Sequence, residues 1–375
     1  MTLLREVCLD QPDYQWQYQL RYERDVVAQI ESLGVLDRFF SNINTRNALI
    51  DIINNENVYY RVRCEATFCL RRVANYMGSN WTGPPAMLNL FRKMFGSPSC
   101  PHIVRMNKFD KFHLYFIQKS MIVAMAGLRT VHGICPHEVL RFLLDLFKYN
   151  DNTKNNFTDA YLRSSLVDAL AETVTPVAIV PIFNSTSLLD MLSQETKNIL
   201  EEITRYFNLD KLLPSYKQVI TISCLFAIRH LQKMGHLPSN PQIFRCHTSN
   251  NCFIEVRKAA IKILVDIVKS EVRKDELDFL LNLITDDPQP VIKFYTLKNL
   301  ILNPPFTFTS EETNPLDTED LVEQLWFLMN NCFSSNSKLR CAVVDFYYVL
   351  YGRGRPRCLP KPEVISIFQK LFSVY

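Results

Sequence analysis

The segment Asp286-Asp287-Pro288-Gln289-Pro290-Val291-Ile292-Lys293 separates two stretches of sequence that are predicted to be helices. Proline either ends the first helix or begins the second, because it is tolerated in the first turn but not in a helix interior. The aspartates can cap the new helix or pair with a basic residue of a neighbouring repeat. Thr296 and Leu300 follow Lys293 at offsets of three and seven positions, so they share one helical face. The segment therefore predicts a turn between two helices.

The same pattern recurs along the chain: an aliphatic residue, a basic residue, and small or apolar residues three and seven positions later. The basic residues are Arg63, Arg163, Arg257, Lys293 and Arg340, and the aliphatic residues before them are Val62, Leu162, Val256, Ile292 and Leu339. The last three basic residues are 36 and 47 positions apart, whereas the two earlier gaps are 100 and 94 positions long. Each wide gap can hold one intervening, divergent repeat. HEAT and armadillo arrays of helical hairpins have periods of about 40–47 residues.

A single helical hairpin cannot cover its own apolar face, so successive hairpins must pack on one another. We therefore predict an all-α fold, a HEAT/armadillo-like α-solenoid of stacked helical hairpins, with the five aliphatic residues in the cores between helices. We expect one solenoid domain over residues 1–375, with a weak break near residues 175–187. Loops are predicted near residues 77–85, 96–111, 175–187, 235–251 and 303–317, where Pro, Asn, Ser and Thr collect.

Composition supports helices and excludes several functional classes. Only nine glycines are present, whereas a β-protein needs glycine at many turns. The net charge of +4 indicates no global attraction to nucleic acid or to a membrane surface. The longest apolar runs are shorter than the roughly 20 residues that span a bilayer. The 11 cysteines form an odd set without a repeated Cys-x-x-Cys spacing, and Glu6 and Asp10 interrupt any signal-like N-terminus. We expect reduced thiols in the cytosol or nucleus.

The sequence predicts no enzyme. His137-Glu138-Val139-Leu140-Arg141 begins like the His-Glu-x-x-His zinc motif but has arginine where the second histidine is required. Two further His and Cys groups, which match no recurrent ligand spacing, are His132, Cys135 and His137, and Cys246, His247 and Cys252. No nucleophile elbow, phosphate-binding loop or dinucleotide fingerprint occurs. We expect no catalytic, metal-binding or cofactor-binding residue and no small-molecule substrate.

One local motif suggests nucleic-acid contact. Gly352-Arg353-Gly354-Arg355-Pro356-Arg357 resembles the core of an AT-hook, a short peptide that binds the minor groove. Glycine permits close backbone approach, and arginines can enter the negative potential of a narrow A·T groove. The alternative is a solvated basic turn between two helices. Arg353, Arg355 and Arg357 are therefore the candidate nucleic-acid contacts, and both interpretations stay open.

Several longer stretches resemble the aminopeptidase-like subunit family of transcription factor TFIID, and the resemblance covers nearly the whole chain from about Leu4 onward. The most characteristic stretches run from Trp16 to Gln29 (WQYQLRYERDVVAQ) and from Trp81 to Met87 (WTGPPAM). Others are Leu146 to Asn152, Leu200 to Arg205, Lys211 to Tyr216, Asn303 to Phe306 and Cys358 to Pro360. The Arg353 to Arg357 run is more basic than the corresponding turn of the family.

The resemblance implies a fold and a role. In this family a HEAT-like helical solenoid follows an aminopeptidase-shaped portion without peptidase activity, and that portion is absent from this sequence. The implied role is a nuclear, non-catalytic scaffold that holds TFIID together and supports core-promoter recognition for RNA polymerase II. The implied partners are other TFIID subunits, especially subunit eight and its own partners. Promoter DNA would be contacted mainly indirectly, through the complex.

Two other functions remain open at this stage. The first is the C-terminal helical domain of an active zinc aminopeptidase, which would also consist of helical repeats and lack the metal motif. An intact His-Glu-x-x-His motif in upstream sequence would support that enzyme. The second is a nuclear-transport or generic HEAT adaptor, against which only the family-like stretches speak.

Overall fold

The protein is described from a computed structural model, which covers residues 11–39, 42–76, 83–176, 193–308 and 314–359. The chain divides into two compact units, Met1–Ser239 (unit 1) and Asn240–Tyr375 (unit 2). Each unit is an array of helical hairpins, so each is described separately.

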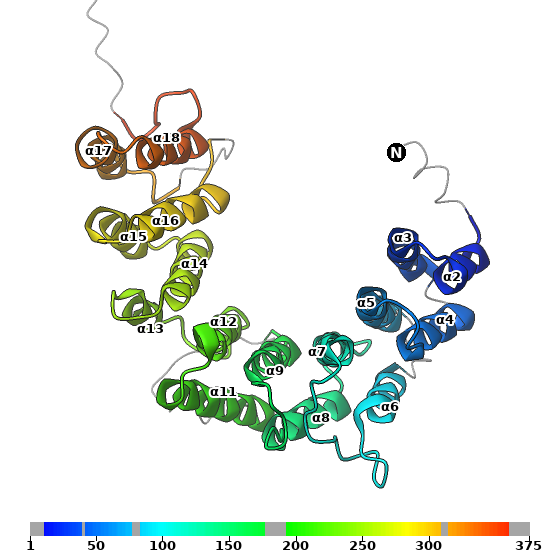
Figure 1. Ribbon diagram of the computed structural model, residues 1–375. Helices are drawn as coiled ribbons and strands as arrows, with labels where there is room; N and C mark the ends of the chain where they lie inside the picture. Colours follow the sequence, from blue (N-terminus) through cyan, green and yellow to red (C-terminus); the bar gives the residue numbers. More distant parts are fainter. Residues whose placement is uncertain (1–10, 40–41, 77–82, 177–192, 309–313, 360–375) are drawn as a thin grey trace, which may run out of the picture. The chain divides into compact units, whose positions relative to one another are not determined.

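The described residues of unit 1 form five consecutive hairpins. They are α2 (Asp13–Tyr22) with α3 (Val26–Leu36), α4 (Ile43–Asn54) with α5 (Tyr60–Tyr76), α6 (Gly83–Phe95) with α7 (Phe112–Ala126), α8 (His137–Lys148) with α9 (Ala160–Thr173), and α11 (Gln194–Leu212) with α12 (Val219–Lys233). The two helices of each hairpin pack against each other. The second helices α3, α5, α7, α9 and α12 also pack in succession, which gives the unit two layers (Figure 1).

The described residues of unit 2 form three more hairpins, and in the third of them the second helix packs mainly on the helical turn that extends the first. They are α13 (Gln242–Arg245) with α14 (Ile254–Glu271), α15 (Lys274–Asp286) with α16 (Pro290–Leu302), and α17 (Glu319–Phe327) with α18 (Ser337–Tyr351). The short 3-10 helix η4 (Cys246–Thr248) extends α13, and a π-helical turn, η5 (Leu328–Cys332), extends α17. The second helices α14, α16 and α18 pack in succession, as in unit 1 (Figure 1).

The predicted all-α solenoid of stacked hairpins is confirmed. The described residues contain no strand, only an isolated bridge between Gly96 and Val104. One hairpin, α6–α7 or α11–α12, occupies each of the two wide gaps in the repeat pattern, as predicted. The aliphatic residues of the repeat are all buried, as predicted, and at most 4% exposed: Val62, Leu162, Val256, Ile292 and Leu339.

Most helix boundaries follow the local sequence signals. The Thr318 side chain accepts a hydrogen bond from the Leu321 N–H and caps α17. The predicted loop at 96–111 lies between helices, as do the described residues 303–308 and 314–317 of the predicted loop at 303–317. The predicted loop at 235–251 is partly wrong, because it contains α13 and η4, the shortened first element of a hairpin. Pro136 is the residue immediately before α8.

The basic residue of the repeat has a role that the sequence pattern did not reveal. In the helices that carry this basic residue, it is the fourth residue of the helix. Gln29 is at the equivalent position of α3. The Arg63 Nε donates to the Ile53 carbonyl at 2.9 Å, the Arg257 Nε to Thr248 at 2.9 Å, and the Lys293 Nζ to Thr285 at 2.6 Å. These carbonyls lie at the end of the preceding helical segment, where they lack intrahelical partners. In these three hairpins the basic residue therefore ties the two helices together, whereas Arg163 bonds Asp159 instead and Arg340 is exposed.

Arg257 also links two hairpins. Its Nη2 donates to Asp287 Oδ2, and its Nη1 donates to Gln289 Oε1 at 3.2 Å, both in the turn before α16. The other oxygen of Asp287 accepts the Gln289 N–H at 2.8 Å. Asp287 thus pairs with a basic residue of a neighbouring repeat, one of the two roles that the sequence suggested for the aspartates. The other role, capping of the new helix, is not observed: Gln289 is the residue before α16, no side chain caps that helix, and the Asp287 contact only closes the turn in front of it. The Arg63 Nη1 and Nη2 have no hydrogen-bond partner among the described residues, and burial lowers the pKa of this guanidinium.

The sequence also led to expectations about the domain break, membrane-spanning helices and the cysteines. Most of the weak break expected at 175–187 lies outside the described residues, and the single domain over 1–375 stays a prediction. Within the described ranges, no helix combines the length and apolar character that a bilayer crossing requires. Every cysteine that the structure describes is a free thiol.

Candidate protein-interaction site

Aromatic side chains gather at the N-terminal ends of the second helices α5, α7 and α9 in unit 1. We call this set the aromatic strip: Tyr59, Tyr60, Phe112, Tyr115, Phe116, Phe157 and Tyr161. Five of them are between 41% and 56% exposed, although aromatic rings usually bury most of their surface: Tyr59, Phe112, Phe116, Phe157 and Tyr161. Because α5, α7 and α9 pack in succession, the strip crosses three hairpins.

Ring contacts join these residues from one hairpin to the next. The ring centroids of Tyr60 and Phe116 are 5.3 Å apart and stacked, which connects α5 to α7. Phe112 meets Phe157 edge to face at 5.6 Å, which connects α7 to the residues before α9. Such offset and edge-to-face pairs are each worth about 0.5–1.5 kcal/mol beyond the area that they bury. The rings therefore support one another while one side of most of them stays in solvent.

Lys119 provides a cationic link along the strip. Its Nζ lies 5.8 Å from the centroid of the Tyr115 ring and 5.7 Å from that of Tyr161. Burial lowers the pKa of Lys119, and the charge of Asp168 partly offsets that effect. Burial also raises the pKa of the Tyr115 hydroxyl to about 12, so this residue stays neutral. The strip thus combines apolar rings with one cation held against their faces.

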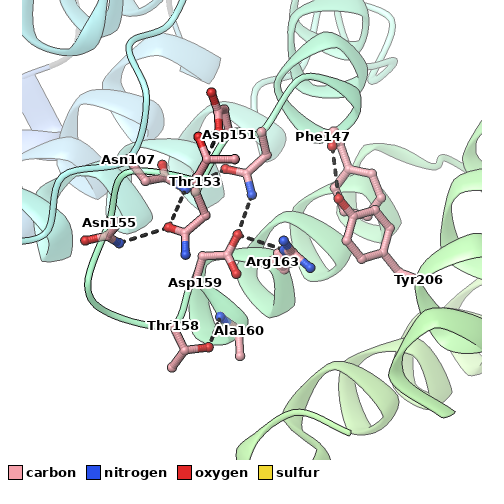
Figure 2. Close-up of polar contacts among 12 residues, drawn as sticks. Asn107, Phe147, Asp151, Thr153, Asn155, Thr158, Asp159, Ala160, Arg163 and Tyr206 are labelled. Atoms are coloured by element: carbon pink, nitrogen blue, oxygen red, sulfur yellow. Dashed lines mark hydrogen bonds and ion pairs between the residues drawn. The ribbon is translucent and has the colours of Figure 1, made fainter. Parts of the chain in front are cut away.

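A network of amide and carboxylate side chains fixes the connection before α9 (Figure 2). Asp159 is 6% exposed, and its Oδ2 accepts from Asn150 Nδ2 at 2.6 Å and from Arg163 Nε at 2.8 Å. Asn107, in the connection before α7, donates to Asn150 Oδ1 at 2.8 Å. Arg163 is the basic residue of this repeat, and it reaches Asn150, in the connection after α8, through Asp159. The network joins the connections of two adjacent hairpins.

The same network positions two aromatic residues. Asn152 and Asn155 donate to the Phe157 carbonyl at 3.0 and 3.1 Å. The Phe109 N–H donates to Asn155 Oδ1 at 3.4 Å, and the buried Phe109 ring contacts Tyr115 at 4.6 Å. Asn155 therefore holds backbone groups on both sides of the Phe112–Phe157 contact. The exposed rings project from a braced segment and not from an unsupported loop.

Sequence reasoning did not identify the aromatic strip. Its members are far apart in sequence, and Tyr60 meets Phe116 only because two hairpins stack in a particular register. The available signal was weak: aromatic residues recur near the start of the second helix in three consecutive hairpins. A hydrophobic cluster at that position is equally typical of a buried core, so exposure had to come from the structure.

The arginines predicted to contact nucleic acid lie in the turn after α18. Arg353, Arg355 and Arg357 are exposed and line a cavity of about 260 Å³, together with Asp317 and Tyr351. Burial, then the charge of Asp317, raises the pKa of the Tyr351 hydroxyl. Gly352 has a φ of 65°, and its N–H donates to the Tyr348 carbonyl, which ends α18. Pro356 is buried, so the turn is anchored on the fold.

The histidine and cysteine groups considered as metal ligands have other contacts. His137 Nδ1 lies 2.9 Å from Glu195 Oε1, and both side chains are largely exposed. His247 Nδ1 donates to the Ile243 carbonyl at 2.8 Å. Across the described part of the chain, no group of three His, Cys, Asp or Glu side chains is placed to hold a metal ion.

Two-layered arrays of hairpins whose second helices stack in succession define an α-solenoid repeat protein. The sequence matches the family described as "TAF2-like, TPR repeats" over residues 13–373, and the chain belongs to this family. TPR and HEAT units are both helical hairpins, so the family agrees with the fold.

Three relatives from an insect, a bird and a yeast bear the same name. "Transcription initiation factor TFIID subunit 2" of Drosophila melanogaster is 51% identical over 373 residues, which are 100% of this chain and 30% of the relative. Its Gallus gallus counterpart is 51% identical over 364 residues, 97% of this chain and 31% of the relative. The Saccharomyces cerevisiae protein is 29% identical over 238 residues, 60% of this chain and 16% of the relative. The resemblance that the sequence indicated is confirmed, and the chain spans less than a third of the length of these relatives.

Proposed function

We propose that this chain is a non-catalytic scaffold and interaction module of TFIID, which supports assembly of the complex and core-promoter recognition for RNA polymerase II. Membership of the TAF2-like family and the names of the relatives support the assignment to TFIID. The aromatic strip supports the interaction role. The proposed site of action is the nucleus, and promoter DNA is engaged mainly through the rest of the complex.

The single observation that carries the interaction role is the exposure of Phe112, Phe116 and Phe157 on a braced surface. Contiguous exposed apolar surface is rare on monomeric proteins and marks sites where another protein binds. Aromatic anchors also contribute a large share of binding energy at interfaces, because they bury much area with few rotatable bonds. A rigid strip loses little conformational entropy when a partner covers it.

The proposed partners are other TFIID subunits, with subunit eight and its associates first among them. Solenoid surfaces bind extended partners across several repeats, and the strip crosses three hairpins. A single residue is therefore expected to contribute only part of the affinity. Two exposed rings that meet between neighbouring hairpins, Phe112 and Phe157, are the most informative positions to change together.

Affinity purification of the tagged chain from nuclear extract, with mass spectrometry of the bound proteins, tests this function. We expect TFIID subunits, including subunit eight, to co-purify with the unmodified chain. The double variant Phe112→Ala, Phe157→Ala should lower their recovery by about tenfold, since loss of a few aromatic anchors at an interface costs about 1.4 kcal/mol or more. Tyr14→Ala is the matched control, because Tyr14 is 63% exposed in the same unit but outside the strip.

Two results would count against the proposal, and they are distinct. Absence of TFIID subunits from the unmodified sample would reject the assignment to the complex. Equal recovery with the unmodified chain and the double variant would keep the assignment but reject the aromatic strip as the contact. Circular dichroism of the variant confirms that the helices are intact before either conclusion is drawn.

A further inference from the structure

A groove in unit 2 lies between α15 and α17, the first helices of consecutive hairpins. Its cavity volume is about 780 Å³, which is enough for several side chains of a bound segment. Leu281 and Thr285 of α15 form one wall, and Val322, Trp326 and Phe327 of α17 form the other. Asn282, Gln324 and Asn331 also line the groove, but most of its lining surface is apolar. The groove lies entirely within one unit.

Two large aromatic side chains of this groove are open to solvent. Trp326 is 66% exposed and Phe327 is 52% exposed, whereas Leu325 and Leu328 beside them are buried. The buried leucines anchor the helix, and the π-helical turn η5 follows directly after Phe327. Asn330 in that turn donates from Nδ2 to the Trp326 carbonyl at 3.0 Å. The two rings are thus presented by a fixed backbone, an arrangement typical of the anchors in a binding pocket.

The charges around the groove are mainly negative at one end. Glu323 lines it, and Asp320 lies one helical turn earlier on α17. Asp278 of α15 lies near Asp275 and Asp320; burial, followed by the charges of those two residues, raises its pKa against the opposing effect of Lys274. Three carboxylates, those of Asp275, Asp278 and Asp320, therefore lie around the Lys274 ammonium group, and Glu323 adds a fourth negative charge in the groove itself.

The cations close to this end are already engaged. Lys274 pairs with Asp320 at 3.0 Å, and Arg245 pairs with Glu276 at 2.7 Å. Lys293 is at the opposite end of α15, where its Nζ donates to the Thr285 carbonyl. The acidic end of the groove therefore keeps an excess of negative charge that a cationic partner can neutralise.

We propose that this groove binds a short amphipathic helix of a partner protein, with aliphatic or aromatic anchors flanked by lysine or arginine. The inference rests on the proposed function of the chain as an interaction module and names the chemistry of one partner segment. α17 has nine residues and is about 14 Å long, which matches roughly two and a half turns of a docked helix. The anchors fill the space between Leu281 and Trp326, and the basic side chains reach the carboxylates.

A synthetic probe tests the proposal with the full chain. The probe is a fluorescein-labelled 15-residue helical peptide with leucine at positions i, i+3, i+4 and i+7 and with lysine at its flanking positions. A second peptide has glutamate in place of every lysine, and a third has alanine in place of every leucine. Fluorescence anisotropy should show saturable binding of the lysine and leucine peptide, with at least tenfold weaker binding of the other two.

Three variants locate the binding. Trp326→Ala removes an anchor and should weaken binding of the lysine peptide by about tenfold or more. Glu323→Lys should weaken the lysine peptide and strengthen the glutamate peptide, a reversal that loss of folding cannot produce. Tyr348→Ala, at a 50% exposed aromatic residue of α18, should leave all affinities unchanged.

Equal affinity of the unmodified chain and Trp326→Ala for the lysine peptide would overturn the proposal, as would equal binding of the lysine and glutamate peptides. Concentration-dependent self-association that Trp326→Ala abolishes, without peptide binding, would assign the groove to a second copy of the chain instead. A negative peptide-binding result would not reject the proposed function, since co-purification of TFIID subunits is measured without the peptides.

Discussion

Arg257 and Asp287 form an ion pair that joins two consecutive hairpins inside unit 2. The Arg257 side chain is 1% exposed and that of Asp287 is 2% exposed, so both charges are withdrawn from water. Each has further partners: Arg257 donates to the Thr248 carbonyl, and Asp287 accepts from the Gln289 N–H. A buried pair is tolerated when such hydrogen bonds satisfy its remaining polar atoms. The pair therefore fixes the register between α14 and the turn before α16.

Asp287→Ala should destabilise the protein by about 3–5 kcal/mol, because it leaves the Arg257 charge buried and uncompensated. Urea unfolding followed by circular dichroism measures the loss. Asp51→Ala is the control, since the Asp51 partner of the surface pair Arg21–Asp51 is 62% exposed, and it should cost less than about 1 kcal/mol. Similar losses for the two variants would show that the buried pair does not couple the hairpins.

Val256→Asp should destabilise unit 2 by several kcal/mol. Val256 is 1% exposed in the core, and an aspartate there has no cationic partner within the apolar interface. Val291→Asp makes the same chemical change at a position that is 57% exposed and should have little effect. Thermal unfolding of both variants checks the difference, and comparable melting temperatures would contradict the assignment of Val256 to the core.

The buried thiols should resist alkylation in the native protein. Burial raises the pKa of Cys69 and of Cys224 to about 12, so almost none of the reactive thiolate is present at pH 8. Iodoacetamide should modify the exposed Cys341 within minutes and modify the other two only after unfolding. Mass spectrometry of peptides shows which cysteines are modified. Rapid modification of Cys224 without urea would contradict the prediction.

The same two pKa values predict how stability changes in alkali. In the unfolded chain these thiols lose their protons near the ordinary value of 9.0, whereas in the native protein they keep them to about 12. The native state therefore binds more protons in this range, and the free energy of unfolding should fall as the pH rises above 9. Urea titrations at pH 8, 9 and 10 test the direction, and stability that rises over this range would be inconsistent with buried thiols.

The purified chain should have no aminopeptidase activity and no stoichiometric zinc. An active zinc aminopeptidase that includes its catalytic portion would have both. The chain has arginine at position 141 where a second histidine ligand is needed. Inductively coupled plasma mass spectrometry measures the zinc content, and hydrolysis of aminoacyl anilides measures the peptidase activity. One tightly bound zinc per chain that disappears in His137→Ala would reverse this expectation.

We expect Arg353, Arg355 and Arg357 to contact DNA through phosphates rather than by insertion into the minor groove. Their side chains are exposed, but Gly352 and the buried Pro356 hold the turn on the fold. Arg355→Ala should weaken binding to A·T-rich and G·C-rich duplexes equally and reduce the salt dependence by about one phosphate contact. Fluorescence anisotropy at two salt concentrations measures both effects. A preference for the A·T-rich duplex that Arg355→Ala removes would establish the hook instead.

The fold could be predicted from the sequence because its signals are local. The turn at Asp287 and the aliphatic residue before each basic residue lie within one hairpin, so periodicity and capping rules apply directly. The function of the basic residue could not be predicted, because the same pattern is compatible with packing between hairpins. Only the three-dimensional structure shows that Arg63 and Lys293 donate hydrogen bonds to carbonyls of the preceding helix.

The interaction surfaces were beyond sequence reasoning for a different reason. The aromatic strip depends on which rings stay exposed after three hairpins stack, and the groove depends on the separation of α15 and α17. Neither the exposure of a ring nor the separation of two helices produces a repeating pattern in the sequence. Trp326 is followed by Phe327 and Leu328, and only the helix orientation decides that the first two face solvent while the third is buried.

The hydrogen bonds from the fourth residue of the second helices also bear on how the chain folds. The donor and the carbonyl are separated by ten residues for Arg63, nine for Arg257 and eight for Lys293. Closing so short a loop costs little chain entropy, and loops of about ten residues close in roughly 10–100 ns. These three hairpins can thus form their internal hydrogen bond before their neighbours exist, which favours their formation as separate local units while the polypeptide is synthesised.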